Sequence, residues 1–158
     1  RMPLPPLPDS AIAIAVDADD WRAAVHAAGS ALAASGATTD AYADRMVDVI
    51  EEYGAYVVVA PGLALAHARP GPEVLAEGIS VVTLAHPVAF GHAHNDPVQV
   101  VVGLAVRTAE GHVASVAELA NVFNDDAVVA SIARATAPGE IRALLGAPSA
   151  GDAGGGAA

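Results

Sequence analysis

The stretch Val98-Gln99-Val100-Val101-Val102-Gly103-Leu104-Ala105-Val106 is rich in β-branched side chains and contains no charge. β-Branched residues favour extended backbone, so this stretch predicts a strand. Residues 56–59 and 79–84 have a similar composition. Apolar runs that do not alternate with polar residues are typical of strands covered by helices on both faces of a sheet. The chain is therefore expected to build its core around a buried sheet.

Shorter signals around these runs complete the predicted fold. Residues 12–16 alternate Ile and Val with Ala, which predicts a further short strand. Helices are predicted where apolar residues recur at helical spacing: between Asp20 and Gly36, between a threonine cap (Thr38 or Thr39) and Gly54, and at 113–123, 127–135 and 140–145. The order of these elements predicts an α/β domain of three layers.

Composition limits the classes of function. The 158 residues include 18 acidic and 7 basic side chains, which gives a net charge of −11 at pH 7. A hydrophobic share of 54% excludes an intrinsically disordered chain, and the length suits one domain. Nucleic-acid affinity depends on clustered Lys and Arg, so the few scattered basic residues argue against a nucleic-acid partner.

Two further features point to the compartment. Cysteine is absent, which excludes disulfide bonds and thiolate zinc sites and fits a reducing environment. The apolar run 55–66 is interrupted by Pro61-Gly62 and is shorter than the roughly 20 residues that span a bilayer. We therefore expect a cytoplasmic protein that does not insert into a membrane.

The two ends differ in composition from the rest of the chain. Residues 1–9 contain four prolines and are expected to form an arm outside the fold. Residues 147–158 are mostly Gly and Ala and are expected to form a disordered tail. The remaining residues, 10–146, are expected to form a single domain.

Five of the six histidines lie between residues 67 and 112. His67 and Arg69 are two residues apart in a segment with strand character, so their side chains should point to the same side. A neutral imidazole is a nucleophile and a guanidinium binds phosphate or carboxylate, which makes the pair a candidate anion site. The alternative is a histidine at a strand end that bonds only to backbone. His112 precedes an apolar helix and could join His67 in a site with two histidines.

A second cluster of histidines allows a different interpretation. His92, His94 and Asp96 could bind a divalent metal from one side of an extended chain. The alternative is a polar loop between two strands, which Gly91 and the segment 95–97 favour. No further ligand lies at a suitable spacing, so the loop interpretation is preferred and no metal or cofactor is expected.

The segment from Glu52 to Pro70, which contains Ala60-Pro61-Gly62-Leu63-Ala64-Leu65-Ala66-His67-Ala68-Arg69, resembles the active-site segment of enzyme IIA of the sugar phosphotransferase system. The likeness is to the mannitol/fructose type and is closest to its ascorbate branch. It extends over about residues 11–145 through several ordered segments: Asp20-Trp21, residues 78–84, Phe90-Gly91-His92, Asn95-Asp96-Pro97-Val98, and His112 before its helix.

This resemblance implies a mixed β-sheet flanked by helices on both faces, and a phosphoryl carrier. By resemblance, His67 would accept the phosphoryl group from the histidine phosphocarrier protein (HPr) and pass it to enzyme IIB for uptake of a sugar such as ascorbate. The membrane component, enzyme IIC, would be an indirect partner. His112 would support the phosphate. Arg69 is added as a candidate phosphate contact because of its spacing from His67.

Other interpretations stay open at this point. A IIA-like protein can act as a regulator whose phosphorylation state controls a target, and a diverged domain could use its histidines to bind metal. The alanine-rich helices could also pack against a second copy of the chain, in a homodimer.

One position departs from the pattern of the family. Ala66 stands where the residue before the active histidine is usually proline, which fixes φ and removes a donor. We expect slower transfer from a looser backbone, so Ala66→Pro should raise the rate of phosphoryl transfer. A transfer rate that does not change in this variant would contradict this account.

Overall fold

A computed structural model describes residues 4–149. The strands are β1 (Ile12–Val16), β2 (Val58–Ala60), β3 (Leu63–His67), β4 (Gly78–Val88) and β5 (Val98–Ala105). The helices are α1 (Trp21–Ala34), α2 (Ala41–Tyr53), α3 (Ala109–Val122), α4 (Asp126–Ala133) and α5 (Pro138–Leu145), with short 3-10 turns at Asp9–Ala11 and Ala55–Val57. Every predicted strand and helix is present, although several boundaries differ.

The five strands form one mixed sheet in the order β1-β4-β5-β3-β2. β1 is parallel to β4 and β3 is parallel to β5, whereas β4 is antiparallel to β5 and β2 is antiparallel to β3. The valine-rich stretch forms β5, which is hydrogen-bonded to a strand on each side. Its position at the centre of the sheet explains why its sequence is apolar on both faces.

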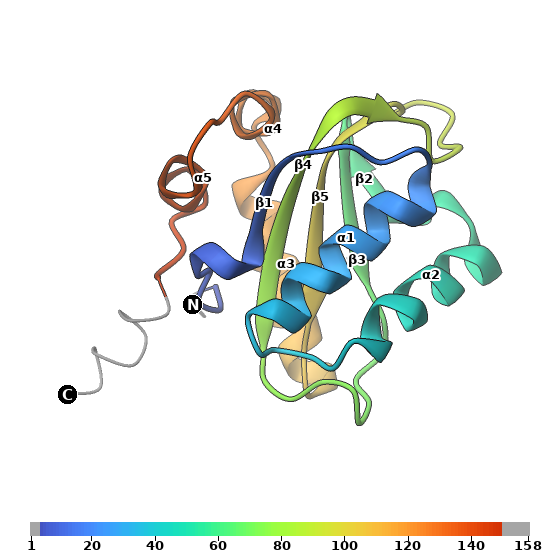
Figure 1. Cartoon of the computed structure of the whole chain (residues 1–158), viewed down its shortest axis with the longest axis vertical. Coiled ribbons are helices and arrows are strands. Elements are labelled where there is room, and N and C mark those ends of the chain that lie inside the picture. The colour runs from blue at the N-terminus through green and yellow to red at the C-terminus, as the bar shows by residue number, and fades with distance from the viewer. Residues whose placement is uncertain (1–3, 150–158) are drawn as a thin grey trace.

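Helices cover both faces of the sheet (Figure 1), so the prediction of three layers around a mixed sheet is confirmed. In β3, Ala64 and Ala66 pack in the core beneath α1 and α2. Leu63 and Leu65 pack into the core on the opposite face, against α3, α4 and α5. The alternation of small and large residues lets one pair of helices approach the sheet closely while leucines fill the space beneath the others.

Local sequence explains where the helices begin and end. The Asp20 carboxylate accepts a hydrogen bond from Ala23 N at 2.9 Å, which caps α1 as the sequence predicts. Gly146 has a φ of 67° and ends α5 in the left-handed conformation. The predicted threonine cap of α2 is wrong: the helix starts after Asp40, and the buried Thr38 hydroxyl has no hydrogen-bond partner.

Residues 4–9 are part of the fold, which corrects the expectation that residues 1–9 form an arm outside it. Leu4 and Leu7 are buried in the core on the α5 face of the sheet. Leu7 N donates to Pro148 O at 2.8 Å, and Arg142 Nη1 donates to Leu7 O at 2.9 Å. The leucines between the prolines make apolar contacts with the core, and an interpretation based on proline content alone did not predict these contacts. Residues 1–3 and most of the expected tail, 150–158, lie outside the described residues.

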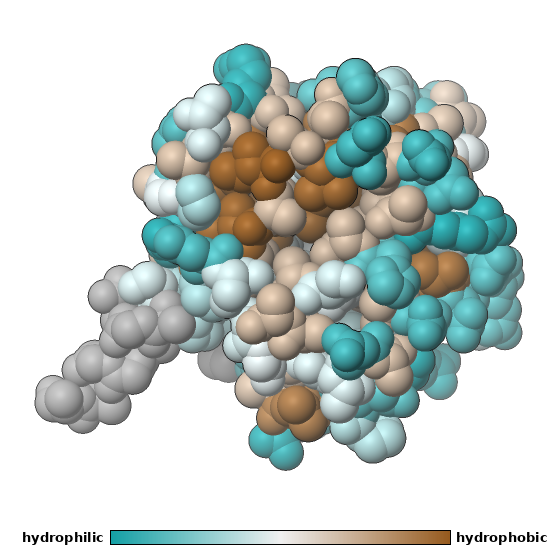
Figure 2. Space-filling model, viewed as in Figure 1, coloured by the Kyte–Doolittle hydropathy of each residue, from teal (hydrophilic) through white to brown (hydrophobic). Residues whose placement is uncertain are grey.

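Polar residues dominate the side of the surface formed by α2, and apolar side chains gather near β1 (Figure 2). β1 is an edge strand in which Ile12, Ile14 and Val16 are only half-buried. Between residues 4 and 149, no helix has the length and apolar character that a membrane span requires.

Close packing of α1 against α2 generates a stability prediction. A Cβ at Gly29 would lie 2.4 Å from Ala43 Cβ and 2.6 Å from Ala43 Cα, so Gly29→Ala must push the two helices apart. We expect a loss of about 1–3 kcal/mol in the free energy of unfolding, measured by urea denaturation. Gly139→Ala is the matched control, because a Cβ there meets no atom within 4 Å. Equal stability of the two variants would contradict this packing.

Candidate functional site

The parallel pairing of β3 with β5 brings the two candidate histidines to one edge of the sheet. His67 is the last residue of β3 and pairs in register with Leu104 near the end of β5. From there the chain turns through Thr108 into α3, which carries His112 in its first turn. Because parallel strands end at the same edge, a residue that ends β3 and one that follows β5 become neighbours.

The rings of His67 and His112 face each other with centroids 4.7 Å apart and planes inclined by 54°. His67 follows Leu63 and Leu65 in the alternation of β3, so its side chain points to the face that α3 covers. The Nδ1 atom of His67 lies 3.3 Å from the Leu65 carbonyl oxygen. A carbonyl can only accept, so this contact favours the tautomer with hydrogen on Nδ1 and a free lone pair on Nε2.

Burial lowers the pKa of His67 below its ordinary value, and the positive charge of a protonated His112 lowers it further. The hydrogen bond to Leu65 acts in the opposite direction and is the weakest of the three effects. An unperturbed histidine has a pKa of about 6.5. His67 is therefore neutral at pH 7, which is the state in which an imidazole nitrogen can act as a nucleophile.

An open pocket of about 820 Å³ surrounds the two rings. Two cationic side chains, Arg45 and Arg69, line it together with His67 and His112. The Arg69 side chain is exposed and forms no hydrogen bond or ion pair within residues 4–149. Arg69 lines the same pocket as His67, and its guanidinium has no partner within the described residues. Its contact with an anion stays a prediction.

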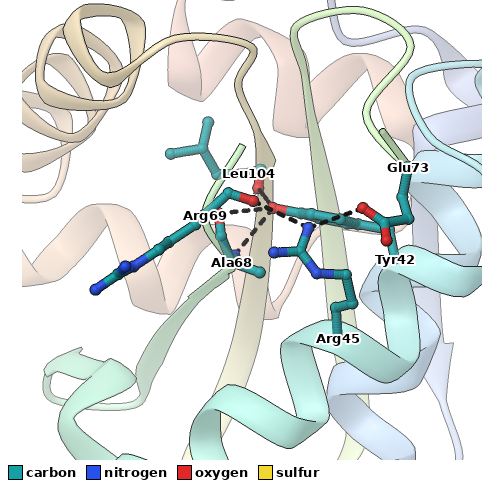
Figure 3. A network of polar contacts seen from close by, with 6 residues as sticks. All are labelled: Tyr42, Arg45, Ala68, Arg69, Glu73 and Leu104. Atoms are coloured by element: carbon teal, nitrogen blue, oxygen red, sulfur yellow. Dashed lines mark hydrogen bonds and ion pairs between the residues drawn. The ribbon is translucent and has the colours of Figure 1, made fainter. Parts of the chain in front are cut away.

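Sequence reasoning missed Arg45 and the role of Tyr42, both from α2. Arg45 Nη1 donates to the Arg69 carbonyl oxygen and to Glu73 Oε1, each at 3.0 Å (Figure 3). Tyr42 is fully buried, and its hydroxyl contacts the backbone on either side of the site. Helical spacing showed only that Tyr42 faces the core, because its hydroxyl partners are backbone atoms from distant segments.

The sequence predicted that His112 lies at the start of its helix, and this prediction is wrong. The helix starts three residues earlier, where the Thr108 hydroxyl caps it by accepting a hydrogen bond from Gly111 N at 2.9 Å. His112 N already donates to Thr108 O at 3.0 Å. The imidazole, rather than the backbone amide of this residue, is therefore the group that faces the pocket.

The second histidine cluster is part of a loop. The Asp96 carboxylate accepts hydrogen bonds from the backbone amides of Phe90, Gly91 and His92. His92 Nδ1 accepts from the amides of residues 94 and 95. The Asp96 carboxylate and His92 Nδ1 therefore form hydrogen bonds within the loop. No group of three or more His, Asp or Glu residues within 4–149 is placed to hold a metal ion.

Ala66 lies inside β3 and not in a loop. It is fully buried and pairs with Gly103 of β5. A proline at this position removes an amide from a paired strand, so the effect of Ala66→Pro on transfer has to be compared with its effect on stability.

Known proteins resemble this chain over most of its length. A family model described as "Phosphoenolpyruvate-dependent sugar phosphotransferase system, EIIA 2" matches residues 6–147. The ascorbate-specific PTS system EIIA component of Salmonella typhimurium is 31% identical over 120 residues, which cover 75% of this chain and 78% of that protein.

Solved structures share the fold. The crystal structure of a PTS IIA protein (PtxA) from Streptococcus mutans superimposes with a TM-score of 0.79 at 29% identity, over 87% of this chain and 88% of that one. The complex of enzyme IIAMTL with phosphorylated enzyme IIBMTL from Escherichia coli gives a TM-score of 0.76 at 24% identity, over 87% and 94%. At the second identity the likeness shows the fold alone.

The contact between the two histidines generates a pH prediction. His112→Gln removes the electrostatic effect of His112 on His67, so the pKa of His67 should rise, as followed by NMR titration of its ring protons. His26→Gln is the control, because His26 lies on α1 beside Asp44 and outside the pocket. An unchanged pKa of His67 in His112→Gln would show that the two rings do not interact in solution.

The lowered pKa of His67 also determines how the stability of the folded protein changes with pH. Because the folded protein holds the pKa of His67 below that of the unfolded chain, the unfolded state binds more protons as the pH falls below about 6.5. His67 therefore lowers the stability of the folded protein on acidification and has no such effect at pH 7.

Proposed function

The chain belongs to the EIIA 2 family of the phosphoenolpyruvate-dependent sugar phosphotransferase system, and we propose that His67 is the residue that carries the phosphoryl group. Members of this family are phosphoryl carriers, so the chain is a phosphotransferase component. The observation that supports His67 most directly is its neutral imidazole, which faces His112 in an open pocket lined by two arginines.

The contact of His67 Nδ1 with the Leu65 carbonyl oxygen supports Nε2 as the reacting atom. With hydrogen on Nδ1 held toward the Leu65 carbonyl, the lone pair of Nε2 attacks the phosphorus of the incoming phosphohistidine. The new P–N bond forms as the P–N bond of the donor breaks, and the donor ring nitrogen takes back its electron pair. The hydrogen stays on Nδ1, so this protein needs no separate base. Positioning and charge stabilisation are the main demands of such a step.

Local positive charge must offset the phosphoryl group, because the protein as a whole has a net charge of −11. His112 lies against the acceptor ring and can donate a hydrogen bond to a phosphoryl oxygen. Arg69 brings a guanidinium to the same pocket. These two side chains are the proposed phosphate contacts, and the chemistry requires no cofactor or metal.

The partners follow from the family and from the shape of the site. We propose HPr as the donor and enzyme IIB as the acceptor, since the mannitol relative is solved in complex with phosphorylated enzyme IIB. The pocket is open, and exposed Tyr53, Tyr56 and Val113 lie on its rim, where a partner surface could bury them. The Salmonella relative suggests ascorbate as the sugar, taken up through a membrane enzyme IIC.

A phosphorelay assay tests the proposal. The protein is incubated with phosphoenolpyruvate, enzyme I and HPr, and its intact mass is followed. We expect an acid-labile gain of about 80 Da, abolished by His67→Ala and slowed by His112→Ala. His26→Ala serves as the control histidine. A gain of the same size in His67→Ala would disprove the assignment of the carrier residue.

Arg69→Ala in the same assay tests the second phosphate contact. Loss of this guanidinium should slow phosphorylation of His67 by about 10-fold without changing the site that is modified. Arg134→Ala removes the same charge from the exposed end of α4 and should leave the rate unchanged. Equal rates in the two arginine variants would show that Arg69 does not contact the phosphate.

Adding enzyme IIB separates transport from regulation. A transport carrier loses its phosphoryl group to enzyme IIB, whereas a regulatory IIA-like protein keeps it and binds a target in one phosphorylation state. Transfer to enzyme IIB with recovery of the unmodified mass supports the transport role.

A further inference from the structure

Directly after His67, a side chain takes the place of the next backbone contact between two strands. β3 and β5 pair in register up to His67 and Leu104. One residue later, Ala68 N donates to the Tyr42 hydroxyl at 3.0 Å, and that hydroxyl donates to Leu104 O at 2.8 Å. The Tyr42 hydroxyl therefore stands between the amide that directly follows β3 and a carbonyl of β5.

The Tyr42 hydroxyl bridges the two backbones at the point where the pairing of β3 with β5 ends. It accepts from one side and donates to the other, so both buried backbone groups are satisfied although they do not meet each other. Tyr42 is fully buried, and burial raises the pKa of its hydroxyl, which therefore keeps its proton at neutral pH. The hydroxyl thus defines the position of the peptide group that follows His67.

Arg45 holds the carbonyl group of Arg69, two peptide groups further along the chain. It lies one turn beyond Tyr42 on α2, and its guanidinium carbon is 5.9 Å from the centre of the Tyr42 ring. Nη1 donates to the Arg69 carbonyl oxygen, and the ion pair with Glu73 fixes the guanidinium from the opposite side (Figure 3). The Arg69 side chain itself extends away from this network. Two residues of one helix, Tyr42 and Arg45, therefore form hydrogen bonds with the backbone on the C-terminal side of His67.

We propose that Tyr42 and Arg45 form a positioning clamp that aims His67 for phosphoryl transfer. The clamp rests on the proposed function, since it sets the geometry of the proposed acceptor. Neither side chain needs to touch the phosphoryl group. The clamp fixes the amide of Ala68 and the carbonyl of Arg69, so that His67 keeps its contact with the Leu65 carbonyl and its Nε2 lone pair faces the donor. A displacement of about 1 Å from such a geometry can slow a reaction by 100-fold.

Tyr42→Phe tests the clamp with the smallest change of shape. It removes the hydroxyl and keeps the ring, so the peptide after His67 loses its tether. We expect the single-turnover rate of phosphorylation by phosphorylated HPr to fall by at least about 10-fold, while the concentration of HPr for half-maximal rate stays unchanged. In the unphosphorylated protein, ¹⁵N NMR should show His67 shifting from the Nδ1–H tautomer toward the Nε2–H tautomer.

Thr83→Val is the matched control. It also removes a buried hydroxyl that accepts from a backbone amide, in this case Ala15 N at 2.8 Å. Thr83 pairs with Val100, which pairs with Leu63 at the end of β3 opposite to His67. This variant should lose stability without changing the transfer rate or the tautomer of His67. If Tyr42→Phe also keeps both the wild-type rate and the wild-type tautomer, the clamp is overturned.

Arg45 provides an independent test should Tyr42→Phe fail to fold. Arg45→Gln should slow transfer and shift the His67 tautomer, and Arg45→Lys should restore part of both because it keeps a charged donor near the Arg69 carbonyl. A slower rate with an unchanged tautomer would assign Arg45 to the phosphate directly and overturn its role in the clamp.

Phosphorylation of His67 tests the proposed function, and the tautomer of His67 tests the clamp. If the wild-type protein gains no phosphate on His67, the proposed function fails. The tautomer measurement on unphosphorylated protein still shows whether Tyr42 and Arg45 orient the ring. A tautomer shift without phosphorylation would support the clamp for a different reaction of His67.

Discussion

The parallel pairing of β3 with β5 is the constraint on which the site depends. His67 ends one strand, and the chain that leaves the other strand enters the helix that carries His112. These residues are 45 positions apart in the sequence (112 − 67), yet the common direction of the two strands delivers them to the same edge. An antiparallel arrangement of the same strands would place them at opposite ends of the sheet.

The composition of β3 decides which way the imidazole points. Ala64 and Ala66 lie beneath α1 and α2, where small side chains allow close approach, and Leu63 and Leu65 fill the core on the other face. Strand alternation then sends His67 toward α3. A slip of one residue would turn the leucines under α1 and α2 and direct His67 away from His112, so the packing of the core and the orientation of the site share one register.

Charge is distributed so that an acidic protein can hold an anion. The net charge of −11 lies mostly on exposed carboxylates, while Arg45 and Arg69 are both at the pocket. The two arginines have different surroundings. Arg45 is paired with Glu73 and the backbone, which suits a structural role, and Arg69 is exposed beside the histidines, which suits contact with a ligand. Local cations near a low-dielectric wall can outweigh a distant negative surface, because exposed charges beyond about 10 Å are largely screened.

The amino-acid sequence by itself determined the strands, the helices and the three-layer class, because these depend on local periodicity. It also predicted that His67 and Arg69 belong to one site, because the two residues are close in the chain. The position of His112 before an apolar helix suggested it as a partner of His67, and the resemblance to one family over about residues 11–145 implied the same role. Proline content misled the interpretation of the N-terminal segment, since burial of Leu4 and Leu7 depends on α5 at the far end of the chain. Only the tertiary structure decided the positions of Tyr42 and Arg45 in the site. Their partners are backbone atoms of Ala68, Arg69 and Leu104. Because nearly every residue has the same backbone groups, a sequence does not show which of them a side chain will contact.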